Sequence, residues 1–493
     1  MKTLAEITTW LKTSDHIKTI LVEIENVAIG SGQSATFYLS NRPFVTAASD
    51  TPSSISYDPC LVGGVSFSET LSLDSSISLG YGDLELDNTG GAKDAWINYI
   101  WVNKPVKIYI GDPRWTRADF RLVFSGLISD ISSRSRESLN LILVDKLQRL
   151  NNPISETVLS SAALGSDTLI PVVFGECFNV SPLVVSSATL TYQVHTGAIE
   201  DIIEVRDNGA PVSFTKDLTD GKFTLNQAPF GQITASVQGA KRGVNYYNTI
   251  PNIILDIVKN YGPTNTRLID SDIDLTNFNT FNTVYPHPVG VYSTNRENIL
   301  DVCNQLAASI GAQLTFSSLG LLKLVKIYYY SGVTYNISPE DIDLDSLQIQ
   351  EKSVVRAATK IGYCKNWTVQ DSGLAAGINP SSLALFNTEY LYSTDIVSIN
   401  VLDYKLTVEP VAEDTLLITQ AGAEWAADDR NALFGIPRTV YTVSGAAHLL
   451  PVELGDGVTL VNPRFGLSSG KLGAIISINR DWIMGKVEIG VLT

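Results

Sequence analysis

The chain has 493 residues, 44% of them hydrophobic, so it is too long for one hydrophobic core and too apolar to be disordered throughout. Its formal net charge is -16 and it has no long run of Lys and Arg, which argues against a nucleic-acid binder. Charged residues make up only 17% of the chain, which suits a surface packed against many neighbours and, equally, an ordinary β-domain surface.

The first 16 residues lack the features of an export signal. Glu6 and several threonines stand where a signal peptide needs a continuous apolar stretch. No segment approaches the ~18 uncharged apolar residues of a membrane-spanning helix. We therefore expect a soluble protein that is made in the cytosol and is not exported by itself.

The first 150 residues are predicted to be mostly β-strand. Apolar residues at helical spacing predict one short amphipathic helix over 4–14. Alternation of polar and apolar residues then predicts a hairpin, in which residues 20–24 and 36–39 flank a turn at Gly30-Ser31-Gly32. Further strands are predicted at 65–67, 106–110, 122–131 and 139–144. These patterns predict one β-barrel or sandwich over residues 1–150.

A boundary is predicted at Asn151-Asn152-Pro153, and a small inserted β-domain over residues 151–243. Two tight-turn sequences support strand pairs there, Asp207-Asn208-Gly209 and Asp220-Gly221-Lys222. The alternation predicts short strands on either side of each turn.

The sequence changes character over residues 244–336, which we predict to be an α+β domain. Apolar residues at helical spacing predict helices over 250–261 and 295–310, followed by a hairpin of 312–316 with 321–327.

Strand patterns return over residues 337–493, which we predict to be a second β-barrel domain with one helix at 414–431. Its last strands are predicted near 458–461, 474–478 and 486–491. The fold class is therefore mainly β, multidomain, with a smaller α+β unit.

Sequence motifs for catalysis are weak. Gly30-Ser31-Gly32 with Ala35 imitates a dinucleotide-binding fingerprint, but a strand follows where that chemistry needs a helix N-terminus, so we predict a turn. Asn366-Trp367-Thr368 matches a glycosylation acceptor, which is a chance match in a bacterial cytosolic product.

Histidine and cysteine are too scattered to form a metal site by spacing. They are His16, His195, His287, His448, Cys60, Cys177, Cys303 and Cys364. We expect reduced thiols, with Cys303 on the buried face of a helix and His287 in a rigid surface loop. Cys177 and His195 could meet in space as nucleophile and base, although structural roles are favoured.

No catalytic, cofactor-binding or metal-ligating residues are therefore predicted, and we expect neither an enzyme nor a bound cofactor. A glycosidase needs only two carboxylates at the right separation, and 51 acidic residues leave that possibility open.

Several segments, in the same order, resemble those of hub proteins at the tail tip or baseplate of tailed bacteriophages. They are Gly80 to Asn88, Lys107 to Gly111, Phe124 to Ile128, Pro171 to Gly175, Thr191 to Gly197, Leu454 to Asp456, Asn462 to Leu467, Ile475 to Asn479 and Gly485 to Val487. Together they span most of the chain. Each motif alone consists largely of residues that are common in turns, so the resemblance depends on the order of the motifs along the chain.

The resemblance implies a virion structural protein that forms a homotrimer. Each subunit would donate two tube-like β-barrels to a pseudo-sixfold ring beneath the hexameric tail tube. The implied partners are the tail tube, distal tail, tape measure and fibre or spike proteins, with a channel for DNA ejection. The protein would be made in the host bacterial cytoplasm and reside at the tail tip. Some tail-tip proteins carry an iron–sulfur cluster on clustered cysteines, and that spacing is absent here.

An acidic chain would give the channel of such a ring a wall that repels DNA over roughly 8 Å at physiological salt. Two other functions are considered. A receptor-binding or carbohydrate-binding tail protein predicts an exposed aromatic groove. A tail-associated cell-wall hydrolase predicts two carboxylates that face each other in a cleft.

Overall fold

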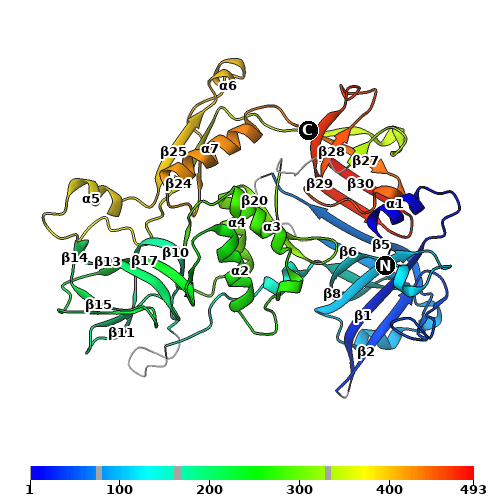
Figure 1. Cartoon of the computed structure of the whole chain (residues 1–493), viewed down its shortest axis with the longest axis horizontal. Coiled ribbons are helices and arrows are strands. Elements are labelled where there is room, and N and C mark those ends of the chain that lie inside the picture. Colours follow the sequence, from blue (N-terminus) through cyan, green and yellow to red (C-terminus); the bar gives the residue numbers. More distant parts are fainter. Residues whose placement is uncertain (1, 31, 74–79, 160–167, 328–334) are drawn as a thin grey trace. The chain divides into compact units, whose positions relative to one another are not determined.

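The computed structural model describes residues 2–30, 32–73, 80–159, 168–327 and 335–493 (Figure 1). The chain divides into two compact units. Unit 1 comprises Met1–Arg149, Gln313–Ser353 and Arg438–Thr493, and unit 2 comprises Leu150–Ala312 and Val354–Pro437. The mainly β, multidomain fold predicted from the sequence is confirmed.

Unit 1 is built on one large sheet of 13 strands. In order across the sheet, eleven of its strands are β2 (Gln33–Ser40), β1 (Thr19–Gly30), β7 (Lys104–Gly111), β8 (Arg121–Ser135), β9 (Ser138–Val144), β6 (Tyr81–Asp87), β5 (Leu61–Thr70), β29 (Lys471–Asp481), β30 (Lys486–Leu492), β27 (Thr439–Gly445) and β23 (Gln348–Lys352). The other two branch from β29: β28 (Gly457–Leu460) pairs with β29, and β22 (Tyr335–Ile337) pairs with β28. Strands β5 and β29 pair antiparallel, Ser68 opposite Asn479. The two ends of the chain therefore share a single sheet.

The predicted N-terminal hairpin is confirmed as β1 and β2, and the predicted first helix as α1 (Leu4–Leu11). Thr3 and Glu6 form a capping box that satisfies the free N–H groups of α1. One face of the region around β1 is closed by an aromatic core, to which the short strands β3 (Phe44–Val45) and β4 (Ser56–Tyr57) contribute. The hairpin of β20 (Ala312–Phe316) and β21 (Leu322–Lys326) also forms as predicted.

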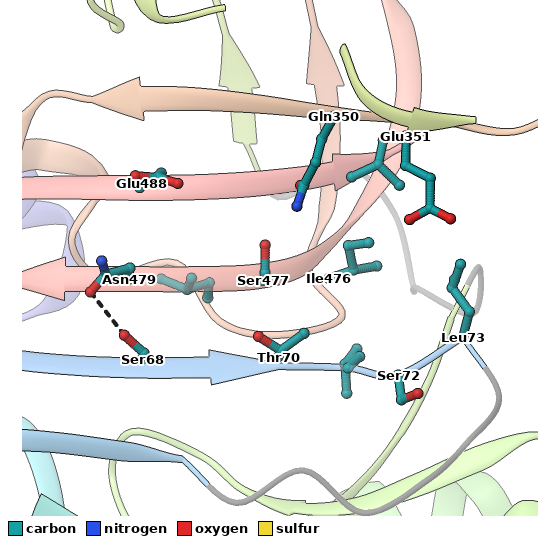
Figure 2. Close-up of a pocket in the computed structure, with 13 residues that line it drawn as sticks. Ser68, Thr70, Ser72, Leu73, Gln350, Glu351, Ile476, Ser477, Asn479 and Glu488 are labelled. Carbon is teal, nitrogen blue, oxygen red and sulfur yellow. Dashed lines mark hydrogen bonds between the residues drawn. The ribbon is translucent and has the colours of Figure 1, made fainter. Parts of the chain in front are cut away.

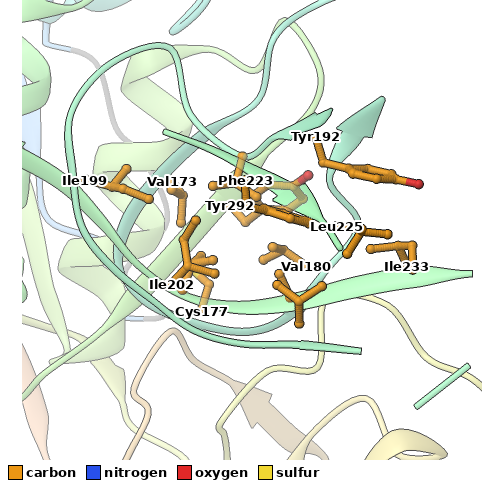
Figure 3. Close-up of a cluster of buried hydrophobic side chains, with 14 residues drawn as sticks. Val173, Cys177, Val180, Tyr192, Ile199, Ile202, Phe223, Leu225, Ile233 and Tyr292 are labelled. Atoms are coloured by element: carbon orange, nitrogen blue, oxygen red, sulfur yellow. The ribbon is translucent and has the colours of Figure 1, made fainter. Parts of the chain in front are cut away.

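A small β-domain in unit 2 consists of two sheets (Figure 3). The first contains β14 (Ala210–Pro211), β13 (Ile199–Asp207), β17 (Ile233–Arg242), β10 (Val172–Val180) and β19 (Gly290–Ser293), with β18 (Asn245–Tyr246) on β17. The second contains β11 (Leu183–Ser186), β12 (Thr191–Gln193), β16 (Lys222–Leu225) and β15 (Phe214–Asp217). Their buried apolar side chains, Val180, Ile202 and Phe223 among them, form one core.

The helices of unit 2 lie in two groups. In the first, α3 (Leu275–Val284) and α4 (Ile299–Ser309) both contact α2 (Ile250–Asn260). In the second, α7 (Gln420–Phe434) packs on a sheet of β25 (Leu391–Ile396), β24 (Ala358–Tyr363) and β26 (Ala412–Asp414). Two short helices, α5 (Pro380–Phe386) and α6 (Ser398–Asp403), lie in the same segment.

Two helix boundaries predicted from the sequence are wrong at their starts. The helix predicted from residue 295 begins at Ile299, because the Asn298 side chain caps it by accepting the Leu300 N–H. The helix predicted from residue 414 begins at Gln420 behind Thr419, and residue 414 ends strand β26 instead.

The four-domain division stays a prediction. Residues 1–149 belong to unit 1 and residues 151–243 to unit 2. Residues 244–336 and 337–493 each contribute to both units. None of the helices in the described part of the chain has the length and apolar composition that crossing a bilayer requires.

Candidate functional site on the large sheet

One face of the large sheet in unit 1 carries a polar surface over strands β5, β29, β30 and β23 (Figure 2). The residues of β29 alternate here: Ile478 and Arg480 are buried, whereas Ser477 and Asn479 face the other way. A pocket of about 560 Å³ opens on this surface. We call this surface the polar face; its side chains are Ser68, Thr70, Gln350, Glu351, Ser477, Asn479 and Glu488.

Strand register arranges the polar face in rows across the sheet. One row runs through Tyr81, Ser68, Asn479, Glu488 and Ser444, each directly opposite the next. Within it the Ser68 hydroxyl donates to Asn479 Oδ1 at 2.9 Å. Cross-strand pairs of this kind fix the side chains relative to one another.

A second row contains Thr70, Ser477, Gly490 and Thr442. Thr442 donates to Gln350 Oε1 at 3.0 Å, which extends the polar contacts to edge strand β23. Gly490 leaves room for the Ser477 hydroxyl, since a Cβ there would lie 2.1 Å from that oxygen and would make the serine side chain rotate. The row therefore consists of short, uncharged side chains and one glycine.

The charged residues of the polar pocket are both acidic, Glu351 and Glu488. In Figure 2 they lie apart, with Gln350 between them. Next to the pocket, Asp481 stands opposite Lys486 in the register. Such a surface can hold water and repel anions, but it brings no acid and base together on a reacting atom.

A cluster of buried charges lies elsewhere in unit 1. Arg480 forms an ion pair with Glu69 and donates to the carbonyls of Leu450 and Val452. Since Arg480 is 2% exposed, these contacts supply the partners that its buried charge needs. They hold the loop at residues 450–452 against β29.

A second buried pair extends this cluster to the β20–β21 hairpin. The Lys323 ammonium lies 2.6 Å from Glu453, which also accepts the Ser318 hydroxyl at 2.7 Å. Burial disfavours the charged form of Glu453, but Lys323 outweighs it and lowers the pKa of that carboxyl. This pair is therefore charged.

Two further carboxyl groups of unit 1 have a raised pKa, in contrast to Glu453. Burial raises the pKa of Asp145 to about 7 and that of Asp456 to about 6. Asp145 accepts the backbone N–H groups of Gly80 at 2.6 Å and Leu147 at 2.8 Å. Neither carboxyl is among the described residues that line the polar pocket. Raised carboxyl pKa values therefore accompany the packing of unit 1 and do not mark the pocket.

Cys177 and His195 do not form the nucleophile and base pair considered from the sequence. His195 Nδ1 accepts the Val173 N–H at 3.1 Å, and its Nε2 lies 3.3 Å from the Tyr261 hydroxyl. Burial lowers the pKa of His195 to about 3, so it is neutral. The Cys177 thiol faces the Phe174 carbonyl at 3.8 Å, and burial raises its pKa. Both side chains are buried and contact the surrounding fold rather than each other as a reactive pair.

The other histidines are also separate from one another. His16 packs edge-on against Trp10, His287 stacks on Trp425 with ring centroids 4.5 Å apart, and His448 lies 2.9 Å from Asp341. His287 is half-buried rather than on the surface.

All four cysteines are free thiols, and Cys303 lies on the buried face of α4 as predicted. Within the described residues, no three His, Cys, Asp or Glu side chains are grouped so that they could hold a metal ion.

Two motif interpretations are confirmed by the structure. Gly30 and Gln33 are paired at the end of the β1–β2 hairpin, so the glycine motif is a turn; Ser31 lies outside the described residues. Asn366 is 3% exposed, and its amide donates to the Phe386 carbonyl at 2.8 Å. A buried amide in this position is not a glycan acceptor.

The sequence analysis did not find the polar face. Its rows depend on the pairing of β5 with β29, and no local pattern specifies which distant strands meet. The one available signal was the alternation of Ser477 and Asn479 with Ile476 and Ile478.

No protein-family model and no curated protein matches this sequence. Comparison with solved structures gives matches that cover most of the chain at low sequence identity. The 43 kDa tail protein of prophage MuSo2 from Shewanella oneidensis is 11% identical, with 97% of this chain and 98% of that chain covered and a TM-score of 0.39.

A tail protein from Neisseria meningitidis MC58 is 10% identical over 97% of this chain and 96% of that chain, with a TM-score of 0.39. A component of the virion of a gene transfer agent particle is 13% identical over 70% of this chain and 91% of that chain, with a TM-score of 0.44. Because these TM-scores are below 0.5, we base the proposed function on the residues of this chain.

Proposed function

We propose that this chain is a structural protein of a bacteriophage tail, the hub at the tail tip, and not an enzyme. The observation that carries the proposal is the large sheet of unit 1, in which β5 and β29 join the two ends of the chain and present the polar face. The ordered tail-hub motifs Gly80 to Asn88 and Ile475 to Asn479 contain strand residues of this sheet. Its strands extend over the parts of the sequence that the resemblance assigns to tube-like barrels.

We further propose that three copies form a ring and that the polar face lines its channel. DNA leaving a virion has to pass without binding. Among the described side chains that line the polar pocket there is no Lys or Arg to bind the phosphates of DNA, and Glu351 and Glu488 are carboxylates. Like charges repel DNA over roughly 8 Å at physiological salt, so a few carboxylates are enough to keep a narrow channel clear.

The ring needs large contacts. Permanent oligomers usually bury upwards of ~2,000 Å² at an interface, and exposed sheet edges are paired or covered in them. Edge strand β23 is exposed along its length. We propose that the tail tube, distal tail, tape measure and fibre or spike proteins cover the remaining contact surfaces of the ring.

The proposal is tested by locating the protein on virions whose genome encodes it. Gold-labelled antibody raised against the full chain should mark one end of the tail, at the tip, in electron micrographs. Label on the capsid, or virions that contain none of the protein, would refute the proposal. Antibody adsorbed with the purified chain is the control.

A carbohydrate-binding tail protein is the second candidate, and one observation favours it. Phe37, Trp96, Tyr99 and Trp101 form an aromatic cluster, with Phe37 4.8 Å from Trp96 and 5.0 Å from Trp101 between ring centroids. Trp96 and Tyr99 are partly exposed, so a sugar ring could stack there. Binding of host surface glycans that is lost in Trp96→Ala would favour this function.

A cell-wall hydrolase requires two carboxylates facing each other, and in Figure 2 Glu351 and Glu488 do not. A turbidity assay with purified peptidoglycan should show no clearing by the wild-type chain. Sustained clearing that is lost in Glu488→Gln would instead establish the hydrolase.

A further inference from the structure

The turn between β16 and β17 presents a phenylalanine to solvent. Phe230 is 96% exposed, although burial of an apolar side chain is favourable. It follows Pro229 in a segment, residues 226–233, that contains no charged residue. Single exposed apolar side chains are common on protein surfaces, so the exposure of Phe230 gains meaning only together with the backbone that fixes it and a pocket that could receive its ring.

The backbone of this turn is fixed by side chains of buried or half-buried residues. Asp207, 8% exposed, accepts the N–H groups of Phe230 at 2.6 Å and Gly231 at 2.8 Å. Asn208 accepts the Gln232 N–H at 2.9 Å. A Cβ on Gly231 would lie 2.1 Å from the Asn208 amide, so glycine is needed for this arrangement. The backbone that carries Phe230 is therefore fixed before binding, which lowers the part of the entropic cost that comes from ordering the turn.

An apolar pocket of about 480 Å³ lies in the same unit, between the β13–β14 turn and α5. Figure 1 shows α5 beside β13 and β14. At the pocket, Phe178 and Phe386 stack with ring centroids 5.9 Å apart, and the Arg206 guanidinium lies over both rings. Pro211, Ile378 and Leu385 add apolar surface. The pocket has the chemistry that accepts an aromatic ring.

The turn and the pocket are tied together. The Asn208 carbonyl accepts the Ala375 N–H at 2.8 Å, and Gln370 donates to the Gln232 side chain at 3.2 Å. The end of β13 and the residue after it therefore contact both the turn that carries Phe230 and the segment that forms one wall of the pocket.

We propose that Phe230 of one copy docks in the Phe178–Phe386 pocket of a second copy of this chain. Charge is consistent with self-association at this place. Among the described residues that line the pocket, the charged ones are Glu204 and Arg206, which pair with each other, and residues 226–233 of the turn carry no charge. Two copies with a net charge of -16 each can therefore meet here without direct repulsion. Docked head to tail, the same contact can be repeated around a closed ring.

This inference rests on the proposed self-assembly and names one of its contacts. The first experiment measures association of the full chain by sedimentation over a range of concentrations. Phe230→Ser should raise the concentration at half-association by at least about tenfold, as expected for an aromatic anchor. Val244→Ser is the matched control, because Val244 is 91% exposed on another turn of the same β-domain. It should associate like the wild type.

The second experiment tests the pairing itself. Chains carrying Phe230→Cys are mixed with chains of different mass carrying Ser382→Cys, at the pocket wall, and treated with a short bis-maleimide. Cross-links between the two kinds of chain are expected, above the level given by wild-type chains with their own cysteines. The masses of the products also tell a two-fold dimer from a closed ring.

The outcomes separate this contact from the proposed function. If Phe230→Ser assembles like the wild type and no mixed cross-link forms, this contact is wrong and the ring stands. If the wild-type chain stays monomeric at every concentration and gives no mixed cross-link, self-assembly in solution and this contact are both wrong. Location of the protein at the tail tip is then decided by the antibody labelling alone.

Discussion

At the level of single residues, the main departures from the sequence pattern are charged side chains inside unit 1. Glu23 is the one charged residue in the predicted strand 20–24, for which the sequence pattern gave no buried partner. The structure instead buries Ile20 through Ile24 without a break, because β1 is covered on both faces. Glu23 is accommodated by Arg117 at 2.6 Å and by the Tyr57 hydroxyl at 2.5 Å. Sequence alone could not find this pair, since its members are distant along the chain.

Removing one partner from this pair should be costly. We predict that Glu23→Ala lowers the free energy of unfolding of unit 1 by about 3–5 kcal/mol, because it leaves the Arg117 charge buried and unpaired. Denaturant unfolding measures the effect. Glu25→Ala is the control: Glu25 lies two residues along β1 and forms a half-exposed pair with Lys107. It should cost less than about 1 kcal/mol. Equal losses in the two variants would contradict the buried pair.

Asp145 predicts a pH dependence of stability. Its pKa is raised to about 7 in the folded protein by burial, whereas an unfolded carboxyl titrates near 4. The folded state therefore keeps a proton that the unfolded state loses, and stability falls as pH rises from about 4 to about 7. Asp456, with a pKa of about 6, contributes in the same direction over the lower part of that range.

In Asp145→Asn the slope of unfolding free energy against pH should become less negative by up to about 1.4 kcal/mol per pH unit between pH 4 and 7. The variant also loses part of the contacts to Gly80 and Leu147, which shifts its stability at every pH but leaves the slope as the readout. An unchanged slope would show that Asp145 is ionised throughout that range.

At the level of elements, strong periodicity was a good guide to the structure. The apolar spacing of α2 and the alternation of β7 gave both elements close to their observed bounds. Helix α3 was not predicted, because its sequence from Leu275 to Val284 is rich in Asn and Thr, which are poor helix formers. It forms because Asp274 caps it and Phe278 and Phe281 are buried.

The segment around α5 depends on one buried amide. The Asn366 NH₂ group donates to the carbonyls of Leu385, Phe386 and Thr388, and its oxygen accepts from Asn179 at 3.0 Å. Asn366→Asp would direct a carboxylate at those carbonyl oxygens. We predict a loss of about 2–4 kcal/mol and rapid proteolysis within residues 371–388.

Limited proteolysis with mass spectrometry measures this effect, and Asn387→Asp, at an exposed position next to α5, is the control. Proteolysis of Asn366→Asp at the wild-type rate would show that the amide does not hold the segment.

At the level of the whole molecule, the sequence indicated the fold class but not how the sheets are assembled. The first 150 residues were predicted as a barrel or sandwich of their own. In the structure, β5 hydrogen-bonds to β29, so their sheet continues into the C-terminal strands. Local patterns give strands and faces but not which distant strands pair, and the polar face is a consequence of that pairing.

A fragment of residues 1–150 should therefore not fold cooperatively. Without β29 it exposes the edge of β5, and it also lacks Arg480, the ion-pair partner of Glu69 on that strand. Near-ultraviolet circular dichroism and thermal unfolding of the fragment measure this, with the full chain as control. A sharp unfolding transition and native aromatic signal in the fragment would show that the shared sheet is dispensable.

The proposed function requires assembly around a channel, with the polar face turned inward. Electron cryomicroscopy of the full chain, assembled at concentrations where sedimentation shows the oligomer, tests this directly. We predict a closed ring of three copies in which Ser68, Asn479 and Glu488 face the channel. A ring with these side chains on its outer surface, or an isolated subunit at every concentration, would contradict it.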